Sequence, residues 1–341
     1  MKTLIIRTDK LGDIYITLPY IKSLIKKFEK ENIDLVLSES IYDHFKNKEY
    51  LFNKVYSYPK NSFFKKLLLL IKLRSQKYQN IIVFDGKDKS IILSILLRSV
   101  RKFIFIEKRK INFILKIIFL NKYKYKLVIN NKLETYGILF ERLINLLDVK
   151  FDNNDFNFLK YENLIHFNLP KNIENNLKSF TMIHLDEKWF SKLYIKDFTD
   201  INPSEEDFLN FIKEFINKKE KTLVVTTGKV NLSLINKLCT KKCTKINDYL
   251  FELNHNNCKA LFFLNTNMRD LEILTMNSNN LITCQGPLTH VAFSFNINVI
   301  DIIEKRLENW YNRHVSKKIN YNKVFRKDFK DLKNDILANL K

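Results

Sequence analysis

The stretch directly after the first apolar run combines residue types that could do chemistry. Asp9, Gly12 and Asp13 follow the strand-like run Thr3–Arg7. A carboxylate in a turn of this kind can act as a general base towards a hydroxyl group. It can also do no more than cap the helix that follows, so the spacing alone leaves both interpretations open.

A second candidate site begins at Gly286. Gly286 and Pro287 suit the first turn of a helix, where backbone N–H groups and the helix dipole attract phosphate. His290 follows one turn later, and Lys188 could neutralise a diphosphate as a point charge. A structural histidine and a solvated lysine are the alternatives to these two functions.

Strand-like apolar runs alternate with helical patterns and would position these residues. One helical pattern has Pro19 near its start, and others cover Ser90–Leu97, Glu134–Leu147 and Phe325–Leu340. The expected strands are Thr3–Arg7, Ile33–Leu37, Asn80–Phe84, Arg101–Ile106, Phe180–Leu185, Thr222–Val225, Ala260–Leu264, Leu281–Thr283 and Asn298–Ile300. Such alternation predicts an α/β protein with parallel sheets covered by helices on both faces.

The length of 341 residues predicts two domains. The polar, Asn-rich stretch Asn153–Asn176 contains Pro170 and is typical of a linker. We therefore expect a first domain over 1–165, a second over 175–320 and a C-terminal helix within 321–341, with a cleft between two doubly wound domains.

The chain has only five glycines, and four of them follow an apolar strand. Gly12, Gly86, Gly228 and Gly286 thus lie at the edge where open α/β sheets bind ligands. Glycine there permits a positive φ and a close backbone approach, although it is also a common turn residue. GxGxxG and GxxxxGK[ST] motifs are absent, which argues against a dinucleotide-binding enzyme and a P-loop NTPase.

The charge balance predicts a polyanionic partner. Lys and Arg total 59 against 37 Asp and Glu, giving +22. Leu51–Lys132 holds 20 basic and three acidic residues. Within it, Phe63–Arg74 and the segment Ile111–Leu120, preceded by Lys108-Arg109-Lys110, mix apolar with basic side chains. Such segments can lie on an anionic bilayer or can form core-facing helices with solvated lysines.

Other sequence signals set further expectations. No apolar stretch reaches the roughly 18 residues of a spanning helix, and the first residues lack a signal-peptide pattern. We expect free thiols, because no CxxC pair occurs. We expect no bound divalent metal, because no convincing DxD motif or His/Asp cluster occurs. The cysteines are Cys239, Cys243, Cys258 and Cys284.

Ile5–Pro19 resembles the amino-terminal signature of glycosyltransferase family 9, the heptosyltransferases. The shared features are an apolar strand, Arg7, the x-Asp-x-x-Gly-Asp turn that ends at Asp13, and a Thr-x-Pro sequence. Thr283–Ala292 resembles the carboxy-terminal nucleotide-site motif of that family, and Lys188-Trp189 falls where the family has its Lys and Trp.

The resemblance implies a GT-B fold, in which two Rossmann-like domains face a cleft. It implies an inverting, metal-independent transferase without a cofactor, which moves a heptose-like sugar from a nucleotide-diphosphate donor, possibly ADP-heptose, to a lipopolysaccharide core or related glycolipid. The expected partners are the nucleotide sugar, a phosphorylated glycolipid acceptor and an anionic inner-membrane surface, with no nucleic acid. The expected location is cytoplasmic, peripheral on the inner face of the inner membrane, and the C-terminal helix is expected to pack back on the first domain.

The resemblance also implies roles for individual residues. Asp13 would be the catalytic base, with Asp9 and Gly12 shaping the turn on the acceptor side. Asn267 would help Met268 to line the base pocket. The residues expected to bind the donor are Lys188, Gly228, Met268, Gln285, Gly286, Pro287, Thr289 and His290.

Three departures from the family pattern leave the donor open. Cys284 stands where the family has an Asp, the interval from Gly286 to His290 is one residue longer, and no acidic residue follows Gly228 directly. A transferase of another sugar or acceptor on the same fold is therefore an alternative. A non-catalytic basic nucleic-acid-binding protein is another, supported by the pI of about 9.6 and by 15 Tyr and 28 Phe available for stacking.

Overall fold

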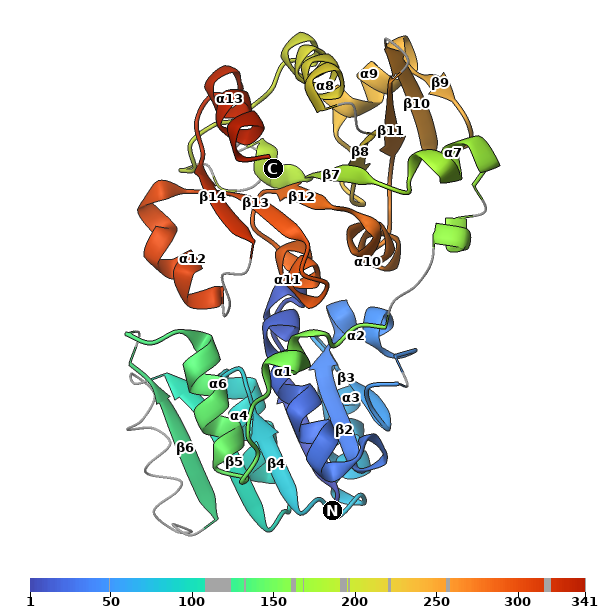
Figure 1. Cartoon of the computed structure of the whole chain (residues 1–341). Helices are drawn as coiled ribbons and strands as arrows, with labels where there is room; N and C mark the ends of the chain where they lie inside the picture. Colours follow the sequence, from blue (N-terminus) through green and yellow to red (C-terminus); the bar gives the residue numbers. More distant parts are fainter. Residues whose placement is uncertain are drawn as a thin grey trace. The chain divides into compact units, whose positions relative to one another are not determined.

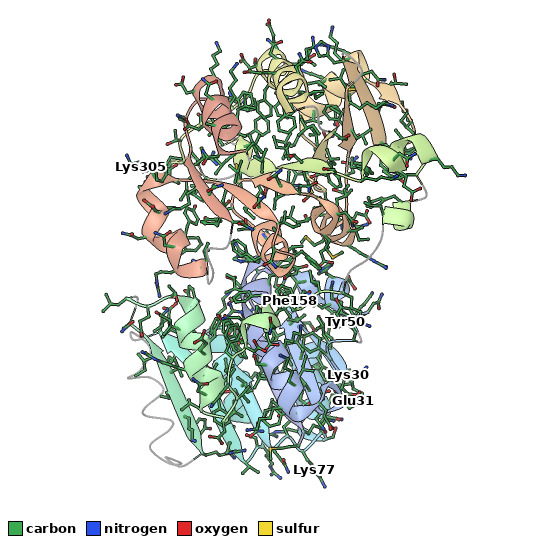
Figure 2. All side chains as sticks on the ribbon, in the orientation of Figure 1. Lys30, Glu31, Tyr50, Lys77, Phe158 and Lys305 are labelled. Atoms are coloured by element: carbon green, nitrogen blue, oxygen red, sulfur yellow. The ribbon has the colours of Figure 1, made fainter. Side chains whose placement is uncertain are left out.

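The chain folds into two units, each built around one sheet (Figure 1). Unit 1 contains Met1–Phe158 and Asn312–Ser316, and unit 2 contains Leu159–Tyr311 and Lys317–Lys341. Contacts thus divide the chain after Phe158, which Figure 2 labels, whereas the sequence placed the boundary between 165 and 175. The computed structural model describes residues 1–48, 50–107, 124–131, 133–160, 164–167, 169–190, 195, 197–219, 222–255, 258–315 and 320–340.

Unit 1 contains a parallel sheet of six strands in the order β3-β2-β1-β4-β5-β6. The strand order runs outward from β1 in one direction and from β4 in the other, so the topological switch point lies between these two strands. The carboxyl ends of β1 and β4 are therefore the expected ligand site. The strands are β1 (Thr3–Arg7), β2 (Ile33–Ser38), β3 (Lys54–Tyr58), β4 (Asn80–Val83), β5 (Arg101–Glu107) and β6 (Tyr125–Asn130).

Helices cover both faces of this sheet. On one face, the ring of Tyr15 in α1 lies 6.0 Å from that of Phe45 in α2, and Tyr20 lies 5.5 Å from Phe140 in α6. On the other face, Leu69 of α3 joins a core cluster with residues of β1, β4 and α4. The helices are α1 (Leu11–Phe28), α2 (Glu39–Phe45), α3 (Phe63–Arg74), α4 (Asp88–Leu96) and α6 (Tyr136–Asn145).

The first helix begins earlier than the sequence suggested. Pro19 lies in the interior of α1 and not near its start, and Gly12 lies in its first turn and not in a separate turn. Proline removes only one backbone donor, and the residues around it, including Leu18 and Tyr20, are buried. Burial of this face therefore keeps the helix intact through the proline.

Unit 2 contains a sheet of eight strands in the order β14-β13-β12-β7-β8-β11-β10-β9. The first six in this order pair in parallel, and β10 and β9 extend one edge as antiparallel strands. The strands are β7 (Phe180–Leu185), β8 (Thr222–Thr227), β9 (Thr244–Lys245), β10 (Leu250–His255), β11 (Cys258–Phe263), β12 (Asn280–Thr283), β13 (Asn298–Ile303) and β14 (Tyr321–Phe325).

The expected linker contains short helical turns. Asn153–Phe156 and Leu164–Phe167 are 3-10 helices, and α7 covers Lys171–Asn176. The remaining helices of unit 2 are α8 (Glu205–Lys219), α9 (Ser233–Lys242), α10 (Met268–Asn277), α11 (Pro287–Ser294) and α13 (Phe329–Asn339). Helix α12 (Glu308–His314) begins in unit 2, and its residues from Asn312 onward belong to unit 1.

The C-terminal helix α13 packs within unit 2, so the prediction that it packs on the first domain is wrong. The ring of Phe329 lies 5.8 Å from Phe208 and 5.7 Å from Phe211, both in α8. Leu332 and Ile336 continue the same buried stripe. An apolar stripe of this kind shows that one face of a helix is buried, but the sequence does not specify which element covers that face.

Several expectations concern segments outside or at the edge of the described part. The segment Ile111–Leu120 and the basic residues before it lie outside the described residues. Within the described ranges, no helix has the length and apolarity needed to cross a membrane.

Cys239, Cys243 and Cys284 are free thiols, as expected, and the first and last of these are buried.

Candidate functional site

A cavity of about 340 Å³ opens at the carboxyl ends of the central strands of unit 1. Three strands contribute residues to it: β1 through Arg7, β4 through the loop at Asp85, and β5 through Glu107. Helices α1 and α6 close its sides. The lining residues are Arg7, Asp9, Asp13, Ile16, Asp85, Gly86, Lys87, Phe105, Glu107, Tyr136 and His314.

Arg7 is the centre of the charge arrangement in this cavity. Its Nη2 atom lies 3.5 Å from Asp9 Oδ2 and 3.9 Å from Asp13 Oδ1. Its Nη1 atom donates a hydrogen bond to the backbone oxygen of Phe84, and its guanidinium lies 5.5 Å from the ring centroid of Phe140. These contacts hold the guanidinium in one orientation, so it fixes both carboxylates.

The two candidate carboxylates differ in access. The side chain of Asp9 is 10% exposed and pairs with Lys87 as well as Arg7. The side chain of Asp13 is 33% exposed. Asp13 Oδ2 accepts a hydrogen bond of 3.2 Å from the backbone N–H of Lys10, at the start of α1. Asp13 therefore does cap the helix through Oδ2, while its side chain also lines the cavity.

The buried carboxyl group of Asp85 holds the loop between β1 and α1 in place. Its Oδ2 atom accepts hydrogen bonds from Thr8 N at 2.6 Å, Thr8 Oγ1 at 3.0 Å and Ser90 Oγ at 2.7 Å. Burial raises the pKa of Asp85, and the neighbouring Asp9 raises it further, while Arg7 and these hydrogen bonds act in the opposite direction. Asp85 thus positions the loop that carries Asp9.

Most of the residues that surround Asp13 were not predicted from the sequence. Lys87 and Asp85 flank Gly86, so the sequence Asp-Gly-Lys after a strand was an available signal. Gly86 is the one glycine of the four with a positive φ, +59°, among the described residues. No local signal marks His314, whose ring lies 4.7 Å from that of Tyr136.

A second cavity of about 550 Å³ adjoins the first and shares Asp9 and Lys87 with it. Five lysines contribute to this lysine-lined cavity: Lys10, Lys60, Lys66, Lys87 and Lys89. Tyr58 separates two of them, with Lys66 Nζ at 5.8 Å and Lys89 Nζ at 5.5 Å from its ring centroid. Burial, and then the charge of Lys87, lowers the pKa of Lys89. The cavity is therefore suited to a bound anion.

In unit 2, Lys188 lies over the start of α11. Its Nζ atom donates to Asp186 Oδ2 and, at 3.2 Å, to the backbone oxygen of Cys284. Burial lowers the pKa of Lys188, but the neighbouring carboxylate of Asp186 outweighs burial and raises it, so the ammonium stays charged. A Cβ atom at Gly286 would lie 3.1 Å from Lys188 Nζ.

This contact explains Gly286 better than backbone strain does. Its φ of 175° is extended backbone that any residue adopts. Gly286 is the N-cap of α11 and Pro287 is its first residue, as the sequence predicted. A positive charge thus lies beside the backbone N–H groups of a helix start, which together suit a phosphate group.

Two titratable groups are buried behind this turn. His184 Nδ1 lies 3.0 Å from Thr226 Oγ1, and burial lowers the pKa of His184 to about 4. Asp301 Oδ2 accepts a hydrogen bond of 3.0 Å from the hydroxyl of Tyr321, and burial raises the pKa of Asp301 to about 7. Both groups are therefore neutral over part of the ordinary pH range.

Comparison with known proteins identifies the fold. No protein-family model matches the chain, and no curated protein sequence is similar to it. E. coli heptosyltransferase WaaC with ADP-2-deoxy-2-fluoro heptose is similar over the whole of both chains, with a TM-score of 0.67 and 13% identity. E. coli ADP-heptose lps heptosyltransferase II is similar over 99% of this chain and 97% of its own, with a TM-score of 0.63 and 12% identity.

A glycosyl transferase of family 9 from Veillonella parvula is similar over 99% of this chain and 90% of its own, with a TM-score of 0.63 and 11% identity. The chain has the GT-B fold of the heptosyltransferases. The resemblance inferred from Ile5–Pro19 and Thr283–Ala292 is thereby confirmed for the fold, and so is the pair of Rossmann-like sheets.

In this GT-B chain, the predicted acceptor-side residues lie together in unit 1. Asp9 and Asp13 line one cavity, and Gly12 lies in the helix turn between them. Lys188, Gly286 and Pro287 also lie together, at the start of α11 in unit 2.

The other predicted donor residues of the GT-B chain have mixed surroundings. Gln285 Nε2 donates to the hydroxyl of Tyr311, and Thr289 is buried. The ring of His290 lies 6.0 Å from that of Phe293. Met268 begins α10, directly after its N-cap Asn267, whose Oδ1 accepts from Asp270 N at 3.1 Å. A Cβ atom added at Gly228 would lie 4.0 Å from His184 Cε1.

The departure at Cys284 has a structural explanation. The thiol is fully buried and burial raises its pKa, so the side chain belongs to the core of unit 2. Its sulfur accepts a contact of 3.9 Å from Arg326 Nη1, and its backbone oxygen is an acceptor for Lys188. In the described part of the GT-B chain, no group of three or more His, Cys, Asp and Glu side chains is placed to hold a metal ion.

Proposed function

We propose that the chain is an inverting glycosyltransferase that moves a heptose-like sugar from a nucleotide-diphosphate donor to a phosphorylated glycolipid. One observation carries this proposal above the others: the partly exposed side chain of Asp13 lines a cavity at the carboxyl end of β1, with Arg7 beside it. A base in such a cavity fits transfer to a hydroxyl group. The GT-B fold supports the same class of reaction.

The proposed reaction is one displacement at the anomeric carbon of the donor sugar. The acceptor hydroxyl gives its proton to Asp13, and its oxygen bonds to the anomeric carbon on the face opposite the diphosphate. The bond from the anomeric carbon to the diphosphate oxygen breaks, and the nucleoside diphosphate leaves with that electron pair. Attack from the opposite face inverts the configuration, and Arg7 and Asp9 keep the base in position.

Departure of the diphosphate needs positive charge, which unit 2 can supply. We assign this role to the ammonium of Lys188 and the N–H groups at the start of α11, beside Gly286. These groups would do the work that a divalent metal does in other transferases. Gln285, Pro287, Thr289 and His290 would complete the donor site, and Met268 would lie at the base.

The lysine-lined cavity would take the anionic part of the acceptor. It shares Asp9 and Lys87 with the Asp13 cavity, so a phosphate held by Lys60, Lys66 or Lys89 would leave a hydroxyl of the same molecule near the base. A glycolipid acceptor also requires a membrane, and we place the enzyme on the cytoplasmic face of the inner membrane.

Calorimetric titration of the purified chain with ADP, UDP and GDP tests the proposal. We expect one nucleotide to bind selectively, and ADP in particular, because similar solved structures are described with ADP and an ADP-heptose analogue. Binding of the nucleotides should be lost in Lys188→Met. If none of the three binds while an oligonucleotide does, the transferase proposal is wrong and the nucleic-acid alternative is supported.

A further inference from the structure

Helix α3 carries an apolar surface that the fold of unit 1 does not use. Leu69 and Leu73 point into the core beneath the sheet. The opposite side of the helix is apolar as well, and its five side chains are exposed. These form the α3 face: Phe63 (74% exposed), Phe64 (76%), Leu67 (42%), Leu68 (65%) and Ile71 (57%).

The spacing of these residues makes one continuous stripe. Positions 63, 67 and 71 follow one another at intervals of four, and 64 and 68 lie beside them, which is the pattern of one helix side. Large contiguous apolar patches are rare on soluble proteins and usually mark a binding surface. Keeping two phenylalanines in water also costs hydrophobic free energy that folding would otherwise gain.

The neighbouring helix α4 extends this surface. Arg74, at the end of α3, donates hydrogen bonds of 3.0 and 2.9 Å to the backbone oxygen of Leu96, at the end of α4. Leu96 is 44% exposed, and Ile92, one turn earlier on α4, is 46% exposed. Both helices lie on the same face of the unit 1 sheet (Figure 1).

Within the chain segment that carries the α3 face, every charge is positive. No Asp or Glu occurs between Glu49 and Asp85, whereas Lys60, Lys65, Lys66, Lys72 and Arg74 lie in α3 or close to it in the sequence. Lys65 and Lys72 are exposed and lie on one flank of it. Lys72 Nζ is held 5.2 Å from the ring centroid of Tyr56. A folded protein partner of mixed charge would not require such a one-sided arrangement, but an anionic lipid surface would.

We propose that the α3 face docks on an anionic lipid bilayer, with Phe63, Phe64 and Leu68 inserted below the head groups and Lys65 and Lys72 on lipid phosphates. Long lysine side chains can reach the head groups while their apolar stems lie along the same surface. The α3 helix lies flat and does not span the bilayer, in keeping with its 12 residues.

Docking through α3 would also place the lysine-lined cavity at the membrane. Lys66 belongs to α3 and lines that cavity, which shares Asp9 with the Asp13 cavity. A glycolipid in the bilayer would thus meet its phosphate site next to the docking helix. Only this last step rests on the proposed function, because lipid binding itself needs no sugar transfer.

Vesicle flotation with the full chain tests the proposal. We expect binding to vesicles of phosphatidylcholine with a quarter phosphatidylglycerol, weaker binding at high salt, and little binding to phosphatidylcholine alone. The double variant Phe63→Ser with Phe64→Ser should lower the partition coefficient at least about tenfold. Lys65→Gln with Lys72→Gln should lower it about fivefold for each lysine. The control is Leu133→Ser, because Leu133 is 87% exposed but lies outside α3 and α4.

The outcomes separate docking from catalysis. Wild-type protein that ignores anionic vesicles, or a serine double variant that binds them as wild type does, overturns the proposal. If the wild-type chain sediments as a dimer and the serine double variant as a monomer, a second copy covers the α3 face and the proposal is equally overturned. ADP titration of the same variants should match the wild type, so failure of nucleotide binding would count against the transferase alone.

Discussion

The guanidinium of Arg7 lies 3.9 Å from the carboxylate of Asp13, measured from Nη2 to Oδ1. The same Nη2 atom lies 3.5 Å from Asp9 Oδ2, so the guanidinium pairs with both carboxylates. Asp9 is nearly buried and pairs with Lys87 too, whereas a third of the Asp13 side chain is exposed. In the proposed reaction, Asp13 is therefore the carboxylate for the acceptor hydroxyl, and Asp9 helps to position it.

Asp13→Asn should abolish sugar transfer and spare nucleotide binding. The amide cannot accept the hydroxyl proton, so we expect turnover to fall about 10²–10⁴-fold. The asparagine oxygen can still accept the N–H of Lys10, so the unfolding midpoint should change little. Steady-state kinetics, ADP titration and urea unfolding measure the three quantities.

The matched control for this variant is Asp43→Asn. Asp43 forms an exposed pair of 2.8 Å with Lys46 on α2, and its side chain is 82% exposed. It should keep wild-type turnover. If Asp13→Asn keeps the wild-type turnover, Asp13 is not the base. Glu107, which lines the same cavity, would then be the next candidate.

Arg7→Gln should destabilise unit 1, and Asp9→Asn should partly restore it. Removing the guanidinium leaves the nearly buried Asp9 next to Asp85 with less compensating charge. Loss of one partner of a buried pair costs about 3–5 kcal/mol, much of it from the charge left behind. Neutralising Asp9 removes part of that charge, so the double variant should unfold at higher urea than Arg7→Gln alone. A double variant no more stable than the single one would contradict this account.

The sequence predicted the elements that are strongly apolar and missed those that are not. The range Phe63–Arg74 coincides with α3, and the strand Thr3–Arg7 coincides with β1. The strands β3, β6, β9, β10 and β14 were not predicted, because many of their residues are only partly buried or exposed and need not be apolar. The position of Pro19 misplaced the start of α1 for a different reason, since packing overrode the local preference of proline.

The candidate site was predictable where one local segment forms it. Asp9, Gly12 and Asp13 lie within one turn and a helix start, and Gly286 and Pro287 form the start of another helix. His314 and Glu107 could not be placed, because they meet Tyr136 only through the tertiary arrangement of distant segments. The reason for Gly286 was also inaccessible, since it depends on Lys188, nearly a hundred residues earlier.

Gly86→Ala should lower the stability of unit 1, and Gly228→Ala should not do so in unit 2. Gly86 has a φ of +59°, and an added Cβ would lie 3.1 Å from the backbone oxygen of Phe105. The left-handed conformation alone costs an alanine about 1–2 kcal/mol. The nearest atom to a Cβ at Gly228 is 4.0 Å away, so that variant is the matched control for stability. Equal urea midpoints for the two variants would contradict this prediction.

Gly286→Ala should weaken nucleotide binding and leave stability nearly unchanged. The added Cβ would lie 3.1 Å from Lys188 Nζ, the mobile end of a side chain, so the ammonium moves and the backbone need not. Displacing one charge-assisted contact to the diphosphate should weaken ADP about tenfold. Calorimetry gives the affinity, and unfolding gives the control. Loss of stability like that of Gly86→Ala, with unchanged affinity, would show that Gly286 serves the backbone only.

Asp301→Asn should make the stability of the chain less dependent on pH between about 4 and 7. The folded-state pKa of Asp301 is about 7 and its ordinary value is 3.8, because burial disfavours the carboxylate. The folded chain keeps the proton up to pH 7, whereas the unfolded chain releases it near pH 4. The stability that Asp301 contributes is therefore full below pH 4 and is lost as the pH rises to 7, by roughly 3–4 kcal/mol.

The difference in unfolding free energy between Asp301→Asn and wild type isolates this effect. Buried His184 acts in the opposite sense, because its pKa is lowered to about 4 and its contribution is lost as the pH falls from 6.5 towards 4. Both proteins contain His184, so its contribution cancels in the difference. We expect the unfolding free energy of Asp301→Asn to rise relative to that of the wild type from pH 4 to 7. Above pH 7.5 this difference should not increase further. A difference that stays flat over this range would show that Asp301 is ionised in the folded chain and that its hydrogen bond from Tyr321 outweighs burial.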